Sequence, residues 1–264
     1  MAYETILLDV SDQIATITLN RPDRLNACSL DMADEIAAGV DEAAAQGARA
    51  LVITGAGKGF CSGADLQAKA ESKQSIAGGA GSYRALMLHY NPLMLKLARL
   101  NMPIITAING AAAGIGCSIA LAGDFVFASK KAFFLQAFVN IGLVPDGGAS
   151  WMLPRLVGKA RATEMMMLGE RIPADRAEDW GLIYKAVEDD ALQAEARALA
   201  VRFANGPTVA YAAMRKNILT SLENSYAEAL LAEAEGQLVA GNSADAAEGA
   251  AAFVEKRQAQ FQGK

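Results

Sequence analysis

Asn-Gly-Ala-Ala-Ala-Gly-Ile-Gly-Cys, residues 109–117, directly follows the apolar run Ile104–Ile108. The apolar run is typical of a buried strand, and the short apolar segment that continues to Gly123 is typical of a helix. The small residues between them allow another group to approach the backbone closely. The stretch therefore predicts a junction from strand through turn to helix, with unpaired N–H groups in the first helical turn.

A second junction of the same kind follows the strand expected at Ala50–Thr54. It reads Phe-Cys-Ser-Gly-Ala-Asp-Leu at residues 60–66. Two main-chain donors aimed at one oxygen would form an oxyanion hole. Glycine-rich turns also serve simply to reverse the chain, and spacing alone leaves both interpretations open. A dinucleotide site fits poorly, because Gly114 and Gly116 lack the third glycine of the fingerprint.

The rest of the chain predicts an α/β protein, with short strands alternating with helices and then a helical tail. A hairpin is expected at Ser11-Asp12, and the polar, glycine-rich segment 69–82 is expected to be a mobile loop. We expect a core domain at 1–195 and a C-terminal helical region at 196–264. The expected further strands are Ile6–Val10, Ile14–Leu19, Phe125–Ala128, Ala132–Leu135 and Tyr184–Val187. The expected helices are Leu30–Gln46, Tyr83–Leu100, Trp151–Leu168, Ala174–Trp180, Ala191–Asn205, Pro207–Leu222, Tyr226–Ala240 and Ser243–Gln258.

Composition narrows the function classes. The formal charge of −5 and pI near 5.1 argue against a nucleic-acid partner. We expect no signal peptide and no membrane span, since no apolar run approaches the length that a bilayer requires. Three cysteines without metal-ligand spacing indicate packing in a reducing cytoplasm, and a single histidine excludes a multi-histidine metal site.

A third feature is the turn Leu-Val-Pro-Asp-Gly-Gly at residues 143–148. Pro145 and the two glycines place Asp146 at the mouth of a helix expected to begin near Ala149. On this pattern alone, Asp146 is a helix-terminal acid that stabilises the macrodipole, or it is a catalyst.

Taken in order, the motifs resemble the landmarks of the crotonase (enoyl-CoA hydratase/isomerase) superfamily. They are Asn-Arg-Pro-x-Arg-Leu-Asn-Ala at 20–27, Gly-Phe-Cys-Ser-Gly-Ala-Asp-Leu at 59–66, 109–116, 142–148, Arg161-Ala162, 177–182 and 253–261. The resemblance covers essentially the whole chain. It implies a ClpP/crotonase-like spiral of ββα units with a C-terminal α-helical oligomerisation region, assembled as a homotrimer or a hexamer of two trimers.

The resemblance also implies the site. The backbone N–H groups of Ala64 and Ile115 would polarise a thioester carbonyl, and the Ile115 side chain, where many members have glycine, would reshape the pocket. Asp146 would be the acid/base, and coenzyme A would arrive as part of the substrate, with no further cofactor and no metal. The residues expected to bind substrate or coenzyme A are Arg24, Ala27, Ser62, Gly63, Ala64, Asp65, Leu66, Phe138, Lys256 and Phe261. Arg24 would contact the coenzyme A phosphates, and the backbone of residues 62–66 would hold the adenine. Lys256 and Phe261 would reach the ligand of this or a neighbouring subunit.

The reaction follows from what replaces the two glutamates of the family's hydratases. Ser118 and Phe138 stand at those positions, and neither can act as a general base near pH 7. Asp146 is similar to the single aspartate of 1,2-epoxyphenylacetyl-CoA isomerase-like and Δ3,Δ2-enoyl-CoA isomerase-like members. A lone carboxylate in an apolar pocket with Phe138 would have a raised pKa and would move a proton between two carbons.

Four alternatives remain open. They are an enoyl-CoA hydratase of fatty-acid or aromatic-acid degradation, a 4-chlorobenzoyl-CoA dehalogenase-like enzyme, a non-catalytic acyl-CoA-binding protein, and an RNA-binding protein. The dehalogenase needs a tryptophan where Phe138 stands, and His89 lies near but not at its histidine position, so we expect His89 on a helix surface. The retained Asp146 argues against a non-catalytic role, and the acidic charge argues against RNA binding.

Overall fold

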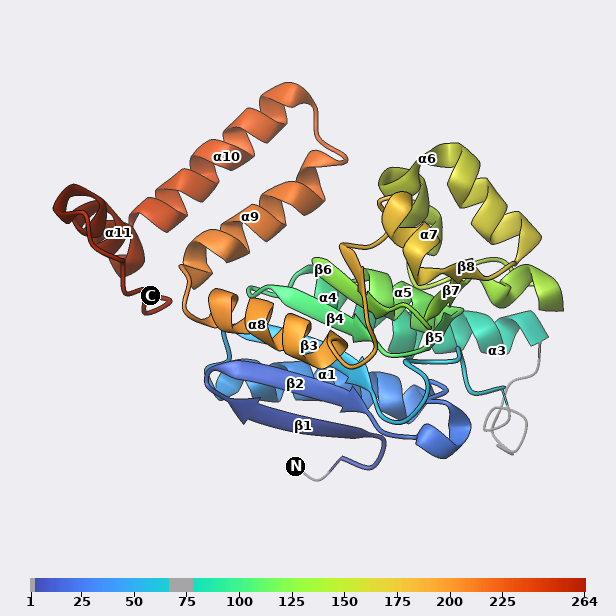
Figure 1. Cartoon of the computed structure of the whole chain (residues 1–264). Helices are drawn as coiled ribbons and strands as arrows, with labels where there is room; N and C mark the ends of the chain where they lie inside the picture. Colours follow the sequence, from blue (N-terminus) through green and yellow to red (C-terminus); the bar gives the residue numbers. More distant parts are fainter. Residues whose placement is uncertain (1–2, 67–77) are drawn as a thin grey trace.

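The computed structural model describes residues 3–66 and 78–264, and its largest element is a six-stranded sheet (Figure 1). The strand order is β1-β2-β3-β4-β6-β9, with β1 antiparallel to β2 and the other pairs parallel. The strands are β1 Ile6–Ser11, β2 Ile14–Leu19, β3 Ala50–Gly55, β4 Ile104–Ile108, β6 Phe125–Ser129 and β9 Lys185–Val187. All six were expected from the sequence to within one residue, including the hairpin between β1 and β2.

A smaller sheet consists of β5 (Ala111–Ala113), β7 (Phe133–Leu135) and β8 (Ile172–Pro173). The chain passes from the large sheet to the small one at Gly110, where an added Cβ would lie 2.1 Å from the Lys58 carbonyl oxygen. The sequence did not predict β5 or β8. Each has at most three residues, which is too short for a strand period to be visible.

Helices cover both faces of the large sheet. Helix α1 (Leu30–Ala45) begins at Ser29, whose side chain accepts a hydrogen bond from the Met32 amide, and packs on the face of Leu51 and Ile53. Helix α8 (Leu192–Ala204) packs on the opposite face with Ala50 and Val52. Adjacent strand residues therefore face opposite layers of the core, as the period of two requires.

One prediction about a loop was wrong in part. Residues 69–77 of the expected mobile loop lie outside the described residues, but helix α3 begins at Gly78 and includes residues 78–82. Helix α3 (Gly78–Ala85), the π-helix η2 (Leu86–Tyr90) and helix α4 (Asn91–Ala98) follow one another directly. Gly78 and Gly79 are weak helix formers, and this misled the sequence interpretation.

The C-terminal helices α9 (Thr208–Ser221), α10 (Tyr226–Gly241) and α11 (Ala244–Glu255) form an arm that extends away from the sheets (Figure 1). None of their residues belongs to the two buried clusters of the core. The division expected at residue 195 falls inside α8, whose buried face belongs to the core, so the arm begins at α9. The remaining elements are η1 Pro22–Arg24, α5 Ile115–Leu121, η3 Ala137–Ile141, α6 Ala149–Leu168 and α7 Ala174–Asp179.

Candidate active site

The two glycine-rich junctions lie side by side. The amides of Phe60 and Cys61 donate to the Ala111 carbonyl over 3.1 and 2.9 Å, and the Ala113 amide donates to the Cys61 carbonyl over 2.9 Å. A Cβ added at Gly63 would lie 3.3 Å from the Ala113 carbonyl oxygen. The close approach of the two backbones explains why this part of each junction is built from small residues.

The Ala64 amide points away from the segment that holds its loop. The Cys28 amide donates to the Gly63 carbonyl over 2.7 Å, and the Asp65 amide donates to the Cys28 carbonyl over 3.0 Å. In a parallel bridge of this kind, the groups of Ala64 itself face the other side. Within the described residues the Ala64 amide has no acceptor, so it is not used by a strand ladder.

The Ile115 amide is also without an acceptor in the described chain. Ile115 is the first residue of α5, and an amide in a first helical turn has no partner within the helix. The preceding Gly114 has φ 53° and donates to the Leu135 carbonyl over 2.9 Å, which fixes the turn. Two unpaired amides therefore lie on adjacent loops, which is the arrangement that an oxyanion hole requires.

Asp146 lies against the first turn of α5. The Ser118 hydroxyl donates to the Asp146 carbonyl oxygen over 2.9 Å. At Gly147, where φ is 60°, an added Cβ would lie 2.5 Å from Ile115 Cδ1 and 2.7 Å from Ser118 Cβ. The same helical turn thus carries the Ile115 amide and holds the backbone of the Asp146 turn. The Ile115 side chain is buried and packs behind Gly147, so any influence on substrate passes through this turn.

The Asp146 carboxyl group does not cap helix α6. Helix α6 has Gly148 at its N-cap, with no hydrogen bond from a side chain there. Asp146 Oδ1 is buried and has no hydrogen-bond partner within the described residues. Burial raises the pKa of Asp146 from 3.8 to about 6. A buried carboxyl with a pKa near neutrality is suited to both accepting and donating a proton.

The interior next to Asp146 is mostly apolar. Burial is the main cause that raises the pKa of Tyr90 and of Cys28, and the charge of Asp146 adds to both. Phe138 is buried, and its ring lies 3.6 Å from the position of a Cβ at Gly114. Phe138 therefore lies next to the turn that carries the Ile115 amide.

Several residues expected at the coenzyme A site lie together. Arg24 is exposed at the end of η1, and its carbonyl accepts hydrogen bonds from the Ala27 amide over 3.0 Å and from the Ser62 hydroxyl over 3.4 Å. Leu66 is also exposed. The prediction for Asp65 concerns its backbone, and its side chain is only 4% exposed and pairs with Arg21. It is directed into the protein and does not face a ligand.

Lys256 and Phe261 do not join this site within one chain. Lys256 ends α11 in the arm, and the Phe261 carbonyl accepts a hydrogen bond from Arg49 over 3.2 Å. Arg49 directly precedes β3, whereas the Phe60 loop follows β3, so the C-terminal tail contacts the opposite edge of the sheet (Figure 1). These two residues can serve a site of this type only in a neighbouring subunit.

The three cysteines and His89 are explained by packing and by a surface ion pair. All three cysteines are free and buried, and burial raises the pKa of Cys61 to about 11 and that of Cys117 to about 12. His89 pairs with Asp34 of α1 over 2.9 Å, on the surface as expected. Within residues 3–66 and 78–264, no cluster of His, Cys, Asp and Glu forms a candidate metal site, and no helix has the length and apolarity to span a membrane.

Three residues whose side chains hold the backbone of the site were not expected from the sequence. Arg21 pairs with Asp65, Ser118 holds the Asp146 carbonyl, and the Tyr90 hydroxyl donates to the Cys28 carbonyl over 2.8 Å. The sequence offered a weak signal for two of them, because Arg21 lies in the quoted motif at 20–27 and Ser118 replaces a glutamate. Nothing in the sequence connected Tyr90 to Cys28.

The α/β fold and the two adjacent turns with unpaired amides are typical of a class of enzymes. Comparison with known proteins identifies the family. The family model described as enoyl-CoA hydratase/isomerase matches residues 9–264. The chain is 42% identical to a "Probable enoyl-CoA hydratase" of Rhodobacter capsulatus over 100% of both chains, and 40% identical to 1,2-epoxyphenylacetyl-CoA isomerase of Escherichia coli over 99% of both. It superposes on the crystal structure of an enoyl-CoA hydratase from Polaromonas sp. JS666 with a TM-score of 0.90 and 31% identity, over 97% of this chain and 99% of that one.

The chain belongs to the enoyl-CoA hydratase/isomerase family, and its fold is the crotonase fold. It is an enzyme of acyl-CoA metabolism that acts on coenzyme A thioesters.

Proposed function

We propose that this chain is an acyl-CoA isomerase in which Asp146 is the single acid/base. The observation that carries the proposal is the partly buried Asp146 carboxyl, whose buried Oδ1 has no partner within the described residues and whose pKa is about 6. It lies beside the helical turn that presents the Ile115 amide.

The reaction needs only proton transfers. The Asp146 carboxylate removes a proton from the carbon next to the thioester carbonyl, and the electron pair moves onto the carbonyl oxygen. The Ala64 and Ile115 amides stabilise that enolate oxygen. When the double bond re-forms at its new place, the protonated Asp146 returns the proton to the distal carbon. A Δ3-enoyl-CoA is the substrate class that fits these steps. A ring epoxide of an aryl acetyl-CoA, for which the E. coli relative is named, is the second class, and there Asp146 would assist a rearrangement of the ring bonds. No cofactor or metal takes part.

Hydration by two carboxylates is the competing reaction, and the R. capsulatus relative is named for it. It needs a second carboxylate beside the first. Among the described residues, burial is the one cause that raises the pKa of Asp146, and no charged side chain there adds to it. The hydratase positions carry Ser118, which is hydrogen-bonded to Asp146, and the buried Phe138. These surroundings favour isomerisation.

The assembly that we propose is a homotrimer, alone or as a hexamer of two trimers, in the cytoplasm. Large apolar side chains of the arm are exposed, among them Phe253 at 85% and Val254 at 80%. Such side chains are normally covered in an assembly. Association would also carry Lys256 and Phe261 towards another subunit.

The experiment compares Asp146→Asn with wild type on Δ3-enoyl-CoA and on crotonyl-CoA. We expect Asp146→Asn to lower kcat for isomerisation by about 10²–10⁴-fold while the thioester still binds, and crotonyl-CoA hydration to be slow in both proteins. The exposed Asp190→Asn is the matched control and should retain full activity. Undiminished isomerisation by Asp146→Asn, or fast hydration by wild type, would refute the assignment.

A further inference from the structure

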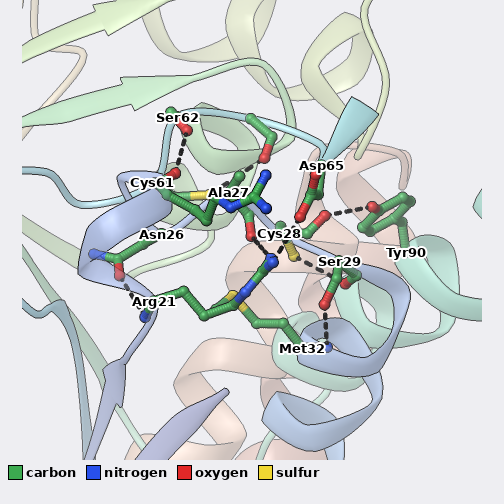
Figure 2. A network of polar contacts seen from close by, with 12 residues as sticks. Arg21, Asn26, Ala27, Cys28, Ser29, Met32, Cys61, Ser62, Asp65 and Tyr90 are labelled. Carbon is green, nitrogen blue, oxygen red and sulfur yellow. Dashed lines mark hydrogen bonds and ion pairs between the residues drawn. The ribbon is translucent and has the colours of Figure 1, made fainter. Parts of the chain in front are cut away.

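A buried ion pair lies one residue from the Ala64 amide. Arg21 Nη2 is 2.7 Å from Asp65 Oδ2, with side chains that are 21% and 4% exposed. Arg21 Nη1 also donates to the Ala27 carbonyl over 2.7 Å. Figure 2 shows the guanidinium group of Arg21 between Asp65 and the chain at Ala27. One side chain therefore connects the loop that carries Ala64 to the segment beneath it.

The segment that contains Ala27 is itself held by several hydrogen bonds. The Asn26 side chain accepts from the Arg21 amide over 2.8 Å and donates to the carbonyls of Ala56 and Gly59 over 2.9 and 2.8 Å. Leu25 and Asn26 have φ values of 49° and 54°, a left-handed conformation that is unfavourable for a leucine. Such conformations persist only where the surroundings impose them, and they are concentrated at functional sites.

Cys28 transmits this arrangement to the Ala64 amide. Its amide donates to the Gly63 carbonyl, its carbonyl accepts from the Asp65 amide, and the same carbonyl accepts from the Tyr90 hydroxyl. The peptide unit between Gly63 and Ala64 is planar and trans, so its carbonyl oxygen and its N–H point in opposite directions. When the Gly63 oxygen is fixed towards Cys28, the Ala64 N–H is fixed towards the opposite side.

We propose that Arg21 and Asp65 are positioning residues that set the direction of the Ala64 amide and thereby the polarisation of the substrate carbonyl. The proposal rests on the proposed function, because it gives the Ala64 amide the role of an oxyanion donor. The guanidinium fork suits this task, since it reaches Asp65 and the Ala27 carbonyl at once, whereas a lysine offers a single point charge. Neither side chain contacts the substrate; both act through the backbone.

The test measures carbonyl polarisation directly. Cinnamoyl-CoA carries a chromophore conjugated with its thioester carbonyl, and polarisation of that carbonyl shifts its absorption band to longer wavelength. The spectrum of the bound thioester is recorded for wild type, Arg21→Lys and Asp65→Asn, each also carrying Asp146→Asn so that no turnover occurs. We expect a red shift in the otherwise wild-type protein that is strongly reduced in both variants.

Kinetics on the variants with Asp146 intact provides the second measurement. We expect kcat to fall by about ten- to a hundredfold in Arg21→Lys and in Asp65→Asn, less than the loss of a whole oxyanion donor, with KM changed by no more than about threefold. Arg197→Lys, which alters a surface ion pair with Asp12, is the matched control and should leave the spectrum and kcat unchanged.

The outcomes separate the two proposals. Without a red shift in the wild-type background, the Ala64 and Ile115 amides are not an oxyanion hole, and the proposed function fails. A normal red shift that persists in the Arg21 and Asp65 variants, with wild-type kcat, would overturn the positioning role alone. If Asp65→Asn does not fold, Arg21→Lys decides, and Tyr90→Phe, which removes one donor to Cys28, should show a smaller loss in the same direction.

Discussion

Asp65 and Asp146 lie in the same site but have opposite surroundings. The Asp65 carboxylate is buried against the Arg21 guanidinium group and is one of the contacts that join two segments of the backbone. The Asp146 carboxyl has a buried Oδ1 without a partner among the described residues, and burial raises its pKa to about 6. The difference teaches that a carboxylate held by an arginine can serve geometry, whereas a carboxyl kept away from other charges can exchange a proton.

The largest effect is expected where the Asp146 turn meets α5. Gly147 has φ 60°, and an added Cβ would be too close to Ile115 and Ser118. Gly147→Ala should destabilise the fold by about 1–3 kcal/mol and lower kcat by about 10²-fold, because the carboxyl group moves away from the amides. Urea unfolding and steady-state kinetics check this, with Gly241→Ala, where an added Cβ meets nothing within 4 Å, as the control. A Gly147→Ala enzyme with normal kcat would show that the turn need not be held in place.

Replacement of the two aspartates by asparagine should change stability in opposite directions. The raised pKa of Asp146 means that the folded state binds a proton between about pH 4 and pH 6 that the unfolded state has released, so this group makes wild type less stable as pH rises through that window. Asp146→Asn should therefore be more stable than wild type at pH 8, by about 1–2 kcal/mol after allowance for partial exposure, and gain little at pH 4.

Asp65→Asn should instead lose stability at pH 8, because it leaves the Arg21 charge without its partner. Thermal unfolding at the two pH values measures both variants. The contrast between the aspartates breaks down if both substitutions shift the stability in the same direction at pH 8.

A smaller effect is expected at Ser118. Ser118→Ala removes the hydroxyl that donates to the Asp146 carbonyl oxygen. The lost hydrogen bond is worth about 1 kcal/mol. Its absence should lower kcat about five- to tenfold with little change in KM. Ser118→Thr keeps the hydroxyl and should restore most of the activity, and the exposed Ser150→Ala is the control. Equal kcat for the alanine and threonine variants would show that the Ser118 hydroxyl does not position Asp146.

The sequence predicted the large sheet, α1 and the positions of the glycine-containing turns for identifiable reasons. All strands of the large sheet except the three-residue β9 alternate or run apolar over five or six residues, and the turns that carry Ala64, Ile115 and Asp146 contain glycines. The short strands β5 and β8 were missed, since two or three residues show no period.

Contacts between segments that lie far apart along the chain could not be predicted from the sequence either. The resemblance assigned a role only to the backbone at Asp65, and only the fold shows that the Asp65 carboxylate pairs with Arg21. The sequence also left open which subunit Lys256 and Phe261 would serve, and only the fold shows that Lys256 lies in the arm and that Phe261 contacts Arg49.

The most direct test of the central claim is the pH dependence of kcat/KM for isomerisation of Δ3-enoyl-CoA by wild type. The ionised Asp146 must accept the first proton, so kcat/KM should rise with pH, reach half its plateau at about pH 6 and stay level above about pH 7. A rate that is independent of pH between about 5 and 8 would contradict the claim that this carboxyl carries the proton.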